Sequence, residues 1–263
     1  MEHGPDGVVH VVLDGPATLN AQDPDTWRAL RRAADKLPAD TRAVVLRGAG
    51  RAFSSGLARS AWPLLADLGS GPLAEVEARI AGFQEAFTCW RQPGVLSVAA
   101  VSGPAVGAGF QLALACDLRL ADDTATFRMA ETSLGLVPDL AGTRPLVRAV
   151  GEAAALEICL SGRTVAAQEA RTLGLVRAVV PQAELAAATD DLVAAVLTSP
   201  ASSAAATLDL LRGADGRDAA HQLVLERAAQ ARLLRGMVAP GTGAGRQAAT
   251  AAPVAEGPGP GRR

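Results

Sequence analysis

Short apolar segments alternate with segments of helical periodicity over much of the chain. Asp23 is a candidate N-cap and Pro24 a candidate first helical residue, so we expect a helix that begins there and ends at Pro38. Runs rich in Val, Leu and Ala predict buried strands over 8–13, 43–47 and 95–101. Because strands and helices alternate, the pattern predicts an α/β fold.

The pattern then shifts from mixed to helical. A mostly polar helical region ends near Arg91, and from Arg144 onward the periodicity is helical apart from one short strand over 178–180. Gly236 is a candidate C-cap for the last of these helices. Between the two regions we expect a glycine-rich turn, a buried helix and two short strands, over 103–109, 110–116, 117–121 and 125–128.

These elements suggest three parts of the chain. We expect an α/β core with the active site over residues 1–185 and a helical region over residues 186–238. Residues 239–263 are rich in Gly, Ala and Pro and have no periodicity, so we expect a disordered tail.

The composition is that of a globular protein. Of 263 residues, 49% are hydrophobic and 20% are charged, and the net charge of −2 disfavours a nonspecific nucleic-acid binder. Residues 92–116 carry no charge and have the length of a membrane span, but Gly and Pro interrupt them, so we expect a buried strand, turn and helix. Three isolated cysteines and an N-terminus without signal-peptide features predict a cytoplasmic protein with no zinc site and no disulfide framework.

The turn over 103–109 joins a buried strand to a buried helix through glycines. Such a turn directs free backbone N–H groups and a helix N-terminus toward one point. It lacks the Gly-Lys-Ser/Thr of a phosphate-binding loop, and Leu112 stands where a dinucleotide fingerprint has its third glycine. Two interpretations remain: an oxyanion hole in an acyl-transfer or enolate-forming enzyme, and a tight junction without chemistry.

Several motifs follow one another along the chain. Residues 48–56 read Gly-Ala-Gly-Arg-Ala-Phe-Ser-Ser-Gly, and the stretch 103–117 ends in Ala-Leu-Ala-Cys-Asp. The other motif segments are 18–21, 127–142 and 161–180. In this order they resemble the crotonase superfamily, the enoyl-CoA hydratase/isomerase family, with its two oxyanion loops, its second acid and its N-terminal turn. The resemblance covers residues 8–235.

The resemblance implies a crotonase-like spiral of ββα repeats followed by a helical trimerisation region, and therefore a homotrimer or hexamer. It implies that the backbone N–H groups of Leu57 and Ala108 hold a thioester carbonyl and stabilise an enolate. Gly56, Gly107 and Gly109 would lie against the substrate. It implies no metal and no cofactor other than the coenzyme A or phosphopantetheine of an acyl-CoA or acyl-carrier-protein substrate.

Three residues bear on the reaction type. Hydratases of this family use two glutamates twenty residues apart; here the first position holds Gln111 and the second holds Glu131. An amide cannot take a proton near neutral pH, so water addition by two carboxylates is impaired. Asp139 stands at the offset where the family's dienoyl isomerases have a proton-transferring aspartate, and a plain turn residue is the alternative. The candidate catalytic residues are thus Glu131, the principal base, with Asp139 and Gln111.

Double-bond isomerisation of an unsaturated acyl thioester is the favoured function. A hydratase or dehydratase that uses Glu131 with Asp139 is one alternative, and a non-catalytic subunit of the same fold is another. Four arginines are weak candidates for CoA phosphate contacts: Arg28, Arg31, Arg32 and Arg59. The family's basic and aromatic terminal motif is missing over residues 236–263, which keeps a carrier-protein substrate open. We expect neither nucleic acid nor membrane as a partner.

Overall fold

The computed structural model describes residues 1–238, and the predicted disordered tail over 239–263 lies outside the described residues. Its largest sheet has six strands in the order β1-β2-β3-β4-β6-β9, and every neighbouring pair except β1 and β2 is parallel. A second sheet has the order β5-β7-β8. The strands are β1 (Glu2–His3), β2 (Val8–Leu13), β3 (Ala43–Gly48), β4 (Leu96–Val101), β5 (Pro104–Val106), β6 (Leu118–Asp122), β7 (Thr126–Arg128), β8 (Thr164–Ala166) and β9 (Ala178–Val180).

Successive turns of the chain each contribute one strand to the large sheet and then one to the small sheet. β4 of the large sheet is followed by β5 of the small sheet and then by a helix, and β6 and β7 repeat the step. Isolated parallel bridges, Gln22 to Leu57 and Ser54 to Ala105, continue the pairing through the two earlier turns. The predicted α/β class and ββα spiral are therefore confirmed. The sequence pattern assigned 103–109 to a turn, whereas β5 forms inside it because Ala105 pairs with Phe127.

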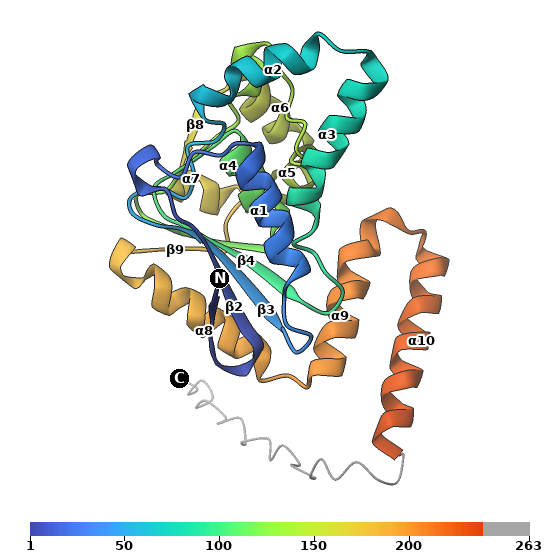
Figure 1. Ribbon diagram of the computed structural model, residues 1–263. Helices are drawn as coiled ribbons and strands as arrows, with labels where there is room; N and C mark the ends of the chain where they lie inside the picture. The colour runs from blue at the N-terminus through green and yellow to red at the C-terminus, as the bar shows by residue number, and fades with distance from the viewer. Residues whose placement is uncertain (239–263) are drawn as a thin grey trace, which may run out of the picture.

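Helices cover both faces of the large sheet (Figure 1). The helices are α1 (Pro24–Asp35), α2 (Trp62–Gly69), α3 (Leu73–Thr88), α4 (Ala108–Ala115), α5 (Thr143–Val150), α6 (Glu152–Ser161), α7 (Ala167–Thr172), α8 (Leu185–Leu197), α9 (Ala201–Gly213) and α10 (Ala219–Val238). α1 starts where the sequence predicts, because the Asp23 side chain accepts a hydrogen bond from the Thr26 N–H at 2.7 Å.

The central strands are apolar on both faces because both faces are buried. Val44 and Leu46 of β3 belong to the core cluster on the side of α1, α3 and α4. Val45 of β3 belongs to the cluster on the opposite side, where Leu185 and Val193 of α8 pack. α8 thus completes the second layer of the core, so the predicted boundary at residue 185 falls at the start of a helix that packs on the sheet.

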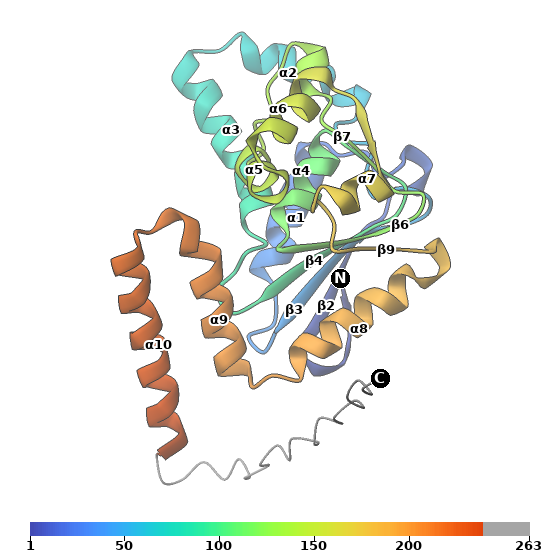
Figure 2. The ribbon, with the colours of Figure 1, turned by 180° about the vertical axis from the view of Figure 1, so that it is seen from behind.

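α9 and α10 form a hairpin that stands beside the sheet (Figures 1 and 2). α9 has no buried residue, and its main tie to the core is Arg212, which donates to Asp117 and to the backbone oxygens of Gln92 and Val95. The prediction that Gly236 caps the last helix is wrong, because α10 continues to Val238.

No single helix within residues 1–238 is long and apolar enough to cross a membrane. The segments 182–197 and 201–216 meet the length and composition criteria only as a pair, and they are bent by 105°.

Candidate active site

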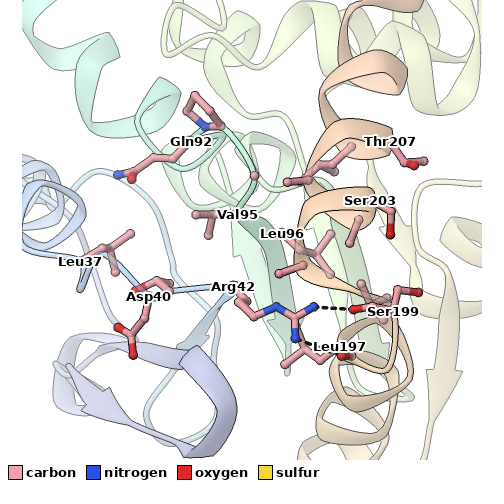
Figure 3. Close-up of a pocket in the computed structure, with 18 of the residues that line it drawn as sticks. Leu37, Asp40, Arg42, Gln92, Val95, Leu96, Leu197, Ser199, Ser203 and Thr207 are labelled. Atoms are coloured by element: carbon pink, nitrogen blue, oxygen red, sulfur yellow. Dashed lines mark hydrogen bonds between the residues drawn. The ribbon is translucent and has the colours of Figure 1, made fainter. Parts of the chain in front are cut away.

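Two hollows lie at opposite ends of the large sheet. The larger, of about 1050 Å³, lies at the amino ends of β3 and β4 and reaches the α8–α9 junction (Figure 3). There Arg42 donates hydrogen bonds to the backbone oxygens of Leu197 at 3.0 Å and Ser199 at 2.8 Å. We call this hollow the helix groove. The guanidinium of Arg42, the cation that lines the helix groove, is therefore already bonded to the helical region.

The smaller hollow, of about 400 Å³, lies beyond the carboxyl ends of β3 and β4, and we call it the acyl cavity. Ligands of parallel α/β sheets bind at this end of the strands. Its polar side is formed by Gly56, Leu57, Gly107, Ala108, Glu131 and Asp139. The structure thus brings six of the eight site residues predicted from the sequence to this cavity. The two exceptions, Gln111 and Gly109, lie behind its wall.

The first loop of the cavity, residues 49–57, is held by buried side chains that sequence reasoning missed. Asn20 donates to the backbone oxygens of Ala49 at 2.9 Å and Ala52 at 2.7 Å. Gln22 donates to Ser54 Oγ at 3.0 Å and accepts from the indole N–H of Trp27 at 2.9 Å. Asn20 lies in the segment that matched the family's N-terminal turn, and that match was the available signal.

The second loop approaches the first through glycines. A Cβ on Gly56 would lie 2.4 Å from the Val106 oxygen, and one on Gly109 would lie 2.4 Å from the Ser54 oxygen, so side chains are excluded at both places. The same Gly56 position is 3.5 Å from the Ala108 nitrogen. Within residues 1–238 the backbone N–H groups of Leu57 and Ala108 donate no hydrogen bond. Two free donors therefore border the cavity side by side.

Glu131 is the buried acid beside these donors. Its side chain is 8% exposed, and its Oε1 would lie 3.2 Å from a Cβ on Gly107, the residue before α4. Burial raises its pKa above the ordinary value, the charge of Asp139 adds to the rise, and hydrogen bonds from Gln111 and the backbone oppose it. Among the described residues its Oε2 is buried without a hydrogen-bond partner. Such an oxygen can accept a proton from a bound molecule.

Gln111 lies behind Glu131, not across the cavity from it. The sequence analysis named Gln111 and Glu131 as the residues at the family's two acid positions and as candidate catalytic residues. In the structure the Gln111 side chain is 1% exposed, and its Nε2 donates directly to Glu131 Oε1 at 2.7 Å. The reason is the turn over 140–142, whose N–H groups bind the Gln111 carbonyl oxygen and so direct its amide nitrogen toward Glu131.

Asp139 lines the cavity, and burial raises the pKa of its carboxyl group. Its backbone oxygen accepts a hydrogen bond from Gln84 of α3 at 2.7 Å. Asp139 and Glu131 are the two carboxyl groups of the cavity wall. The placement is compatible both with a second proton-transfer group and with a turn residue.

The remaining wall is apolar and comes largely from α2 and α3, in the region that sequence analysis described as mostly polar. The apolar side chains are Trp27, Trp62, Leu65, Leu68, Val76, Ile80 and Phe83. On α3, Val76, Ile80 and Phe83 recur at i, i+4 and i+7, but the charged residues between them led the sequence analysis to describe the region as mostly polar. This wall suits an apolar group.

The four candidate arginines differ in their surroundings. Arg28 pairs with Asp25, Arg31 pairs with Asp35, and Arg32 is exposed on α1. Arg59 follows Leu57 by two residues and forms no ion pair within residues 1–238. It is therefore the candidate arginine that is exposed, unpaired within residues 1–238 and nearest in sequence to the cavity loop.

Comparison with known proteins gives a consistent result. A family model described as enoyl-CoA hydratase/isomerase matches residues 3–237. A Thermus thermophilus protein named as an enoyl-CoA hydratase is 39% identical over 176 residues, which cover 66% of this chain and 68% of that protein. The chain thus spans about two thirds of the length of such curated relatives. Crystal structures of a Thermobifida fusca protein named as an enoyl-CoA hydratase, with CoA and with acetoacetyl-CoA, are 43% identical and have a TM-score of 0.81. The alignment covers 89% of this chain and 92% of the CoA-bound one.

Proposed function

The chain belongs to the enoyl-CoA hydratase/isomerase family, and on that premise we propose that it moves a double bond in an unsaturated acyl thioester. The observation that carries the proposal is Glu131, a buried acid with one unpartnered oxygen beside two free backbone donors. Gln111 stands where a second acid would be needed for water addition, and it cannot exchange a proton near neutral pH. One base and one oxyanion hole suffice for isomerisation.

The reaction proceeds in two proton transfers. Glu131 Oε2 takes a proton from the α-carbon of a 3-enoyl thioester, and the C–H electron pair enters an enolate whose oxygen carries the negative charge. The N–H groups of Leu57 and Ala108 bind that oxygen, and each such donor is worth about 2.7–4 kcal/mol in the transition state. The proton then returns to the γ-carbon, from Glu131 or from Asp139, and the double bond lies between the α and β carbons. No atom is gained or lost.

Hydration is the second candidate, because the curated relatives are named as hydratases. In that reaction Asp139 would replace the carboxylate that Gln111 lacks, since Asp139 and Glu131 line the same cavity. Both reactions pass through an enolate that the same two N–H groups can hold. Isomerisation forms it by removing an α-proton from a 3-enoyl thioester, and hydration forms it by adding water to the β-carbon of a 2-enoyl thioester. The substrate panel described next therefore separates them.

The test follows both reactions in one protein. The purified chain is incubated in D₂O with a 3-enoyl-CoA and a 2-enoyl-CoA, and hydration, isomerisation and deuterium uptake at the α-carbon are measured separately. We expect α-deuteration and migration of the 3-enoyl double bond, with slower hydration. Hydration that outpaces isomerisation from pH 6 to 9 would favour the hydratase. Absence of both, in a folded protein, would favour a non-catalytic subunit.

We propose coenzyme A as the thioester carrier. Support comes from the CoA-bound Thermobifida fusca structures and from Arg59, an exposed cation two residues after Leu57 that forms no ion pair within residues 1–238. Arg59→Gln should raise KM for the CoA thioester and leave KM for the matching pantetheine thioester unchanged. Arg28→Gln, which removes a cation already paired with Asp25, is the control. Equal KM values for both thioesters in the wild type would favour a carrier-protein substrate.

We further propose that α9 and α10 join copies of the chain into a trimer or hexamer. Exposed apolar side chains on these helices support this: Leu211, Leu223, Val224, Leu234 and Met237. Light scattering after size exclusion should give three or six times the chain mass, and Leu223→Glu with Val224→Glu should lower it. A wild-type monomer at micromolar concentration would contradict the proposal.

A further inference from the structure

Gln111 is buried on α4 between two groups that fix its amide in one orientation. Its Oε1 accepts hydrogen bonds from the backbone N–H groups of Leu140 at 2.8 Å and Gly142 at 3.3 Å. A flipped amide would set its NH₂ group against these two donors and lose both bonds. The Nε2 must therefore be the atom that faces Glu131, where it donates at 2.7 Å.

A fixed donor at this place constrains the base. Because Nε2 can only donate, Glu131 Oε1 must offer it a lone pair and is the poorer proton acceptor of the two oxygens. The other oxygen, Oε2, is buried and has no partner among the described residues. The two oxygens of one carboxyl group are thus inequivalent: one is bonded to the protein, and the other is left for a ligand.

The surrounding turn is shaped around the Gln111 side chain. A Cβ on Gly142 would lie 2.7 Å from Gln111 Cγ and 2.9 Å from its Oε1. Gly142 itself has φ −80° and ψ −23°, which any residue can adopt, so the glycine is needed for space and not for backbone freedom. Ala141, beside it, has φ +64°, so the turn is held in a strained form that aims two N–H groups at Gln111.

We propose that Gln111 is a positioning residue that holds Glu131 Oε1 and reserves Oε2 for both proton transfers. The inference rests on the proposed function, in which Glu131 is the base. It assigns Gln111 no contact with substrate, in keeping with its place behind the cavity wall. A single proton-carrying oxygen removes and returns the proton on one face of the enolate.

The same bond favours the ionised form of the base. A hydrogen bond to the carboxylate favours its charged form and offsets the burial that raises its pKa. Within residues 1–238, the other titratable groups that interact with Glu131 are Asp139 on the same loop and Cys159 on α6. Neither touches the Gln111 amide. Loss of the amide donor should therefore move the acidic limb of the rate profile upward, since the base would protonate at higher pH.

The test compares two independent ways of removing the donor. Gln111→Met keeps the side-chain length without a donor, and Gly142→Ala displaces the native amide by crowding its Cγ and Oε1. In each, α-proton exchange is measured from pH 5 to 9. We expect the acidic limb to rise by about one to two pH units, which is the worth of a charge-assisted hydrogen bond, and kcat to fall about tenfold or more. KM should stay within about twofold.

Gly82→Ala is the control, because a Cβ at Gly82 in α3 meets nothing within 4 Å. It should leave the profile in place. An unchanged limb in both test variants, or a tenfold rise in KM at unchanged kcat, would overturn the positioning role. If Gln111→Met does not fold, Gly142→Ala still decides the outcome. If instead Glu131→Gln retains exchange, the proposed function itself fails, and the two failures are distinct.

Discussion

The acyl cavity and the helix groove lie at opposite ends of the same strands, and the proposed chemistry belongs to the smaller of them. The groove has more than twice the volume. Its cation Arg42 is bonded to backbone oxygens of the helical region, and its Thr41 hydroxyl is buried without a hydrogen-bond partner among the described residues. The cavity has two free N–H groups and an unpartnered carboxylate oxygen. An unpartnered carboxylate beside two free N–H donors can bind and deprotonate a ligand, which a lone hydroxyl in a larger hollow cannot do.

Backbone strain shows the same contrast. Four described residues other than glycine have positive φ: Asp6, Leu19, Asn20 and Ala141. Asn20 holds the first cavity loop, Leu19 precedes it, and Ala141 lies in the turn that binds Gln111. None of the four lines the helix groove. Strain of about 1–3 kcal/mol per residue is retained around the cavity, where it orients reactive groups.

The largest effect should follow from Glu131→Gln in the cavity. The variant cannot accept the α-proton, so exchange should fall 10²-fold or more, with thioester binding nearly intact. Because burial raises the pKa of Glu131, its ionised form costs folding stability at neutral pH. The variant should therefore melt at the same temperature or higher. Exchange above about a tenth of wild type would remove Glu131 as the base.

The matching change at the groove end of the sheet is Arg212→Ala. It should lower the free energy of unfolding and leave the rate of α-proton exchange unchanged. The pair is largely buried, with Arg212 14% and Asp117 10% exposed, and breaking such a pair costs about 3 kcal/mol. Denaturant unfolding at fixed protein concentration measures the loss. Arg31→Ala, which breaks an exposed pair, should cost under about 1 kcal/mol. Equal losses in the two variants would contradict the anchoring role.

The Asp117–Arg212 pair also predicts a pH dependence. Burial opposes the charge on Asp117, but the hydrogen bonds and charge of Arg212 and the bonds from Ser97 outweigh it, so its pKa lies below the ordinary value of 3.8. A carboxyl group with a lowered folded pKa contributes stability that is complete above that ordinary value. The contribution is lost as pH falls through the folded pKa. In Arg212→Ala this acid-sensitive part of the unfolding free energy should shrink.

A smaller effect should follow from Ala141→Gly. Glycine adopts positive φ without steric cost, and after its greater unfolded-state entropy is counted the variant should gain about 1 kcal/mol. Thermal unfolding measures the gain. If the strained turn aims Gln111, the gain in stability should come with slower exchange. A destabilised variant would show that Ala141 is not strained.

The smallest expected effect is that of acyl-chain length, which the apolar wall of the cavity should set. Each methylene added to the acyl chain should raise kcat/KM about fourfold, from about 0.8 kcal/mol of burial, until the cavity is full. Val76→Phe should shift the optimum to shorter chains, because Val76 lines the wall. Leu211→Phe, in the helix groove, is the control and should not move it. A chain-length profile that is flat in the wild type would show that the acyl group lies elsewhere.

The sequence predicted most of the fold because local and global signals agree there. β3 and β4 are rich in Val, Leu and Ala, as expected of strands whose two faces are both buried, and β2 is an apolar strand with one face buried and the other half-buried. The cavity glycines were likewise visible, since each marks a backbone approach that a Cβ would block. That the backbone N–H groups of Leu57 and Ala108 act as oxyanion donors remains a prediction.

What escaped prediction depends on contacts between distant residues. The direction of the Gln111 amide is set by the turn over 140–142, about thirty residues away, and no spacing rule contains that information. The apolar wall on α3 is a stripe of Val76, Ile80 and Phe83 at helical spacing, but spacing alone does not say whether such a stripe faces a packed layer or a hollow. Both features require the tertiary arrangement.

The anchorage of α9 has a consequence for the order of folding. Arg212 binds the backbone before β4 and the carboxylate before β6, which lies 95 residues earlier in the chain. Such long-range contacts form late, because closing large loops costs entropy before any contact compensates for it. We expect the helical hairpin to dock only after β4 and β6 have paired. The surface proposed to join subunits would then form only on chains whose central strands and cavity loops have already folded. Partly folded chains would therefore not enter the assembly.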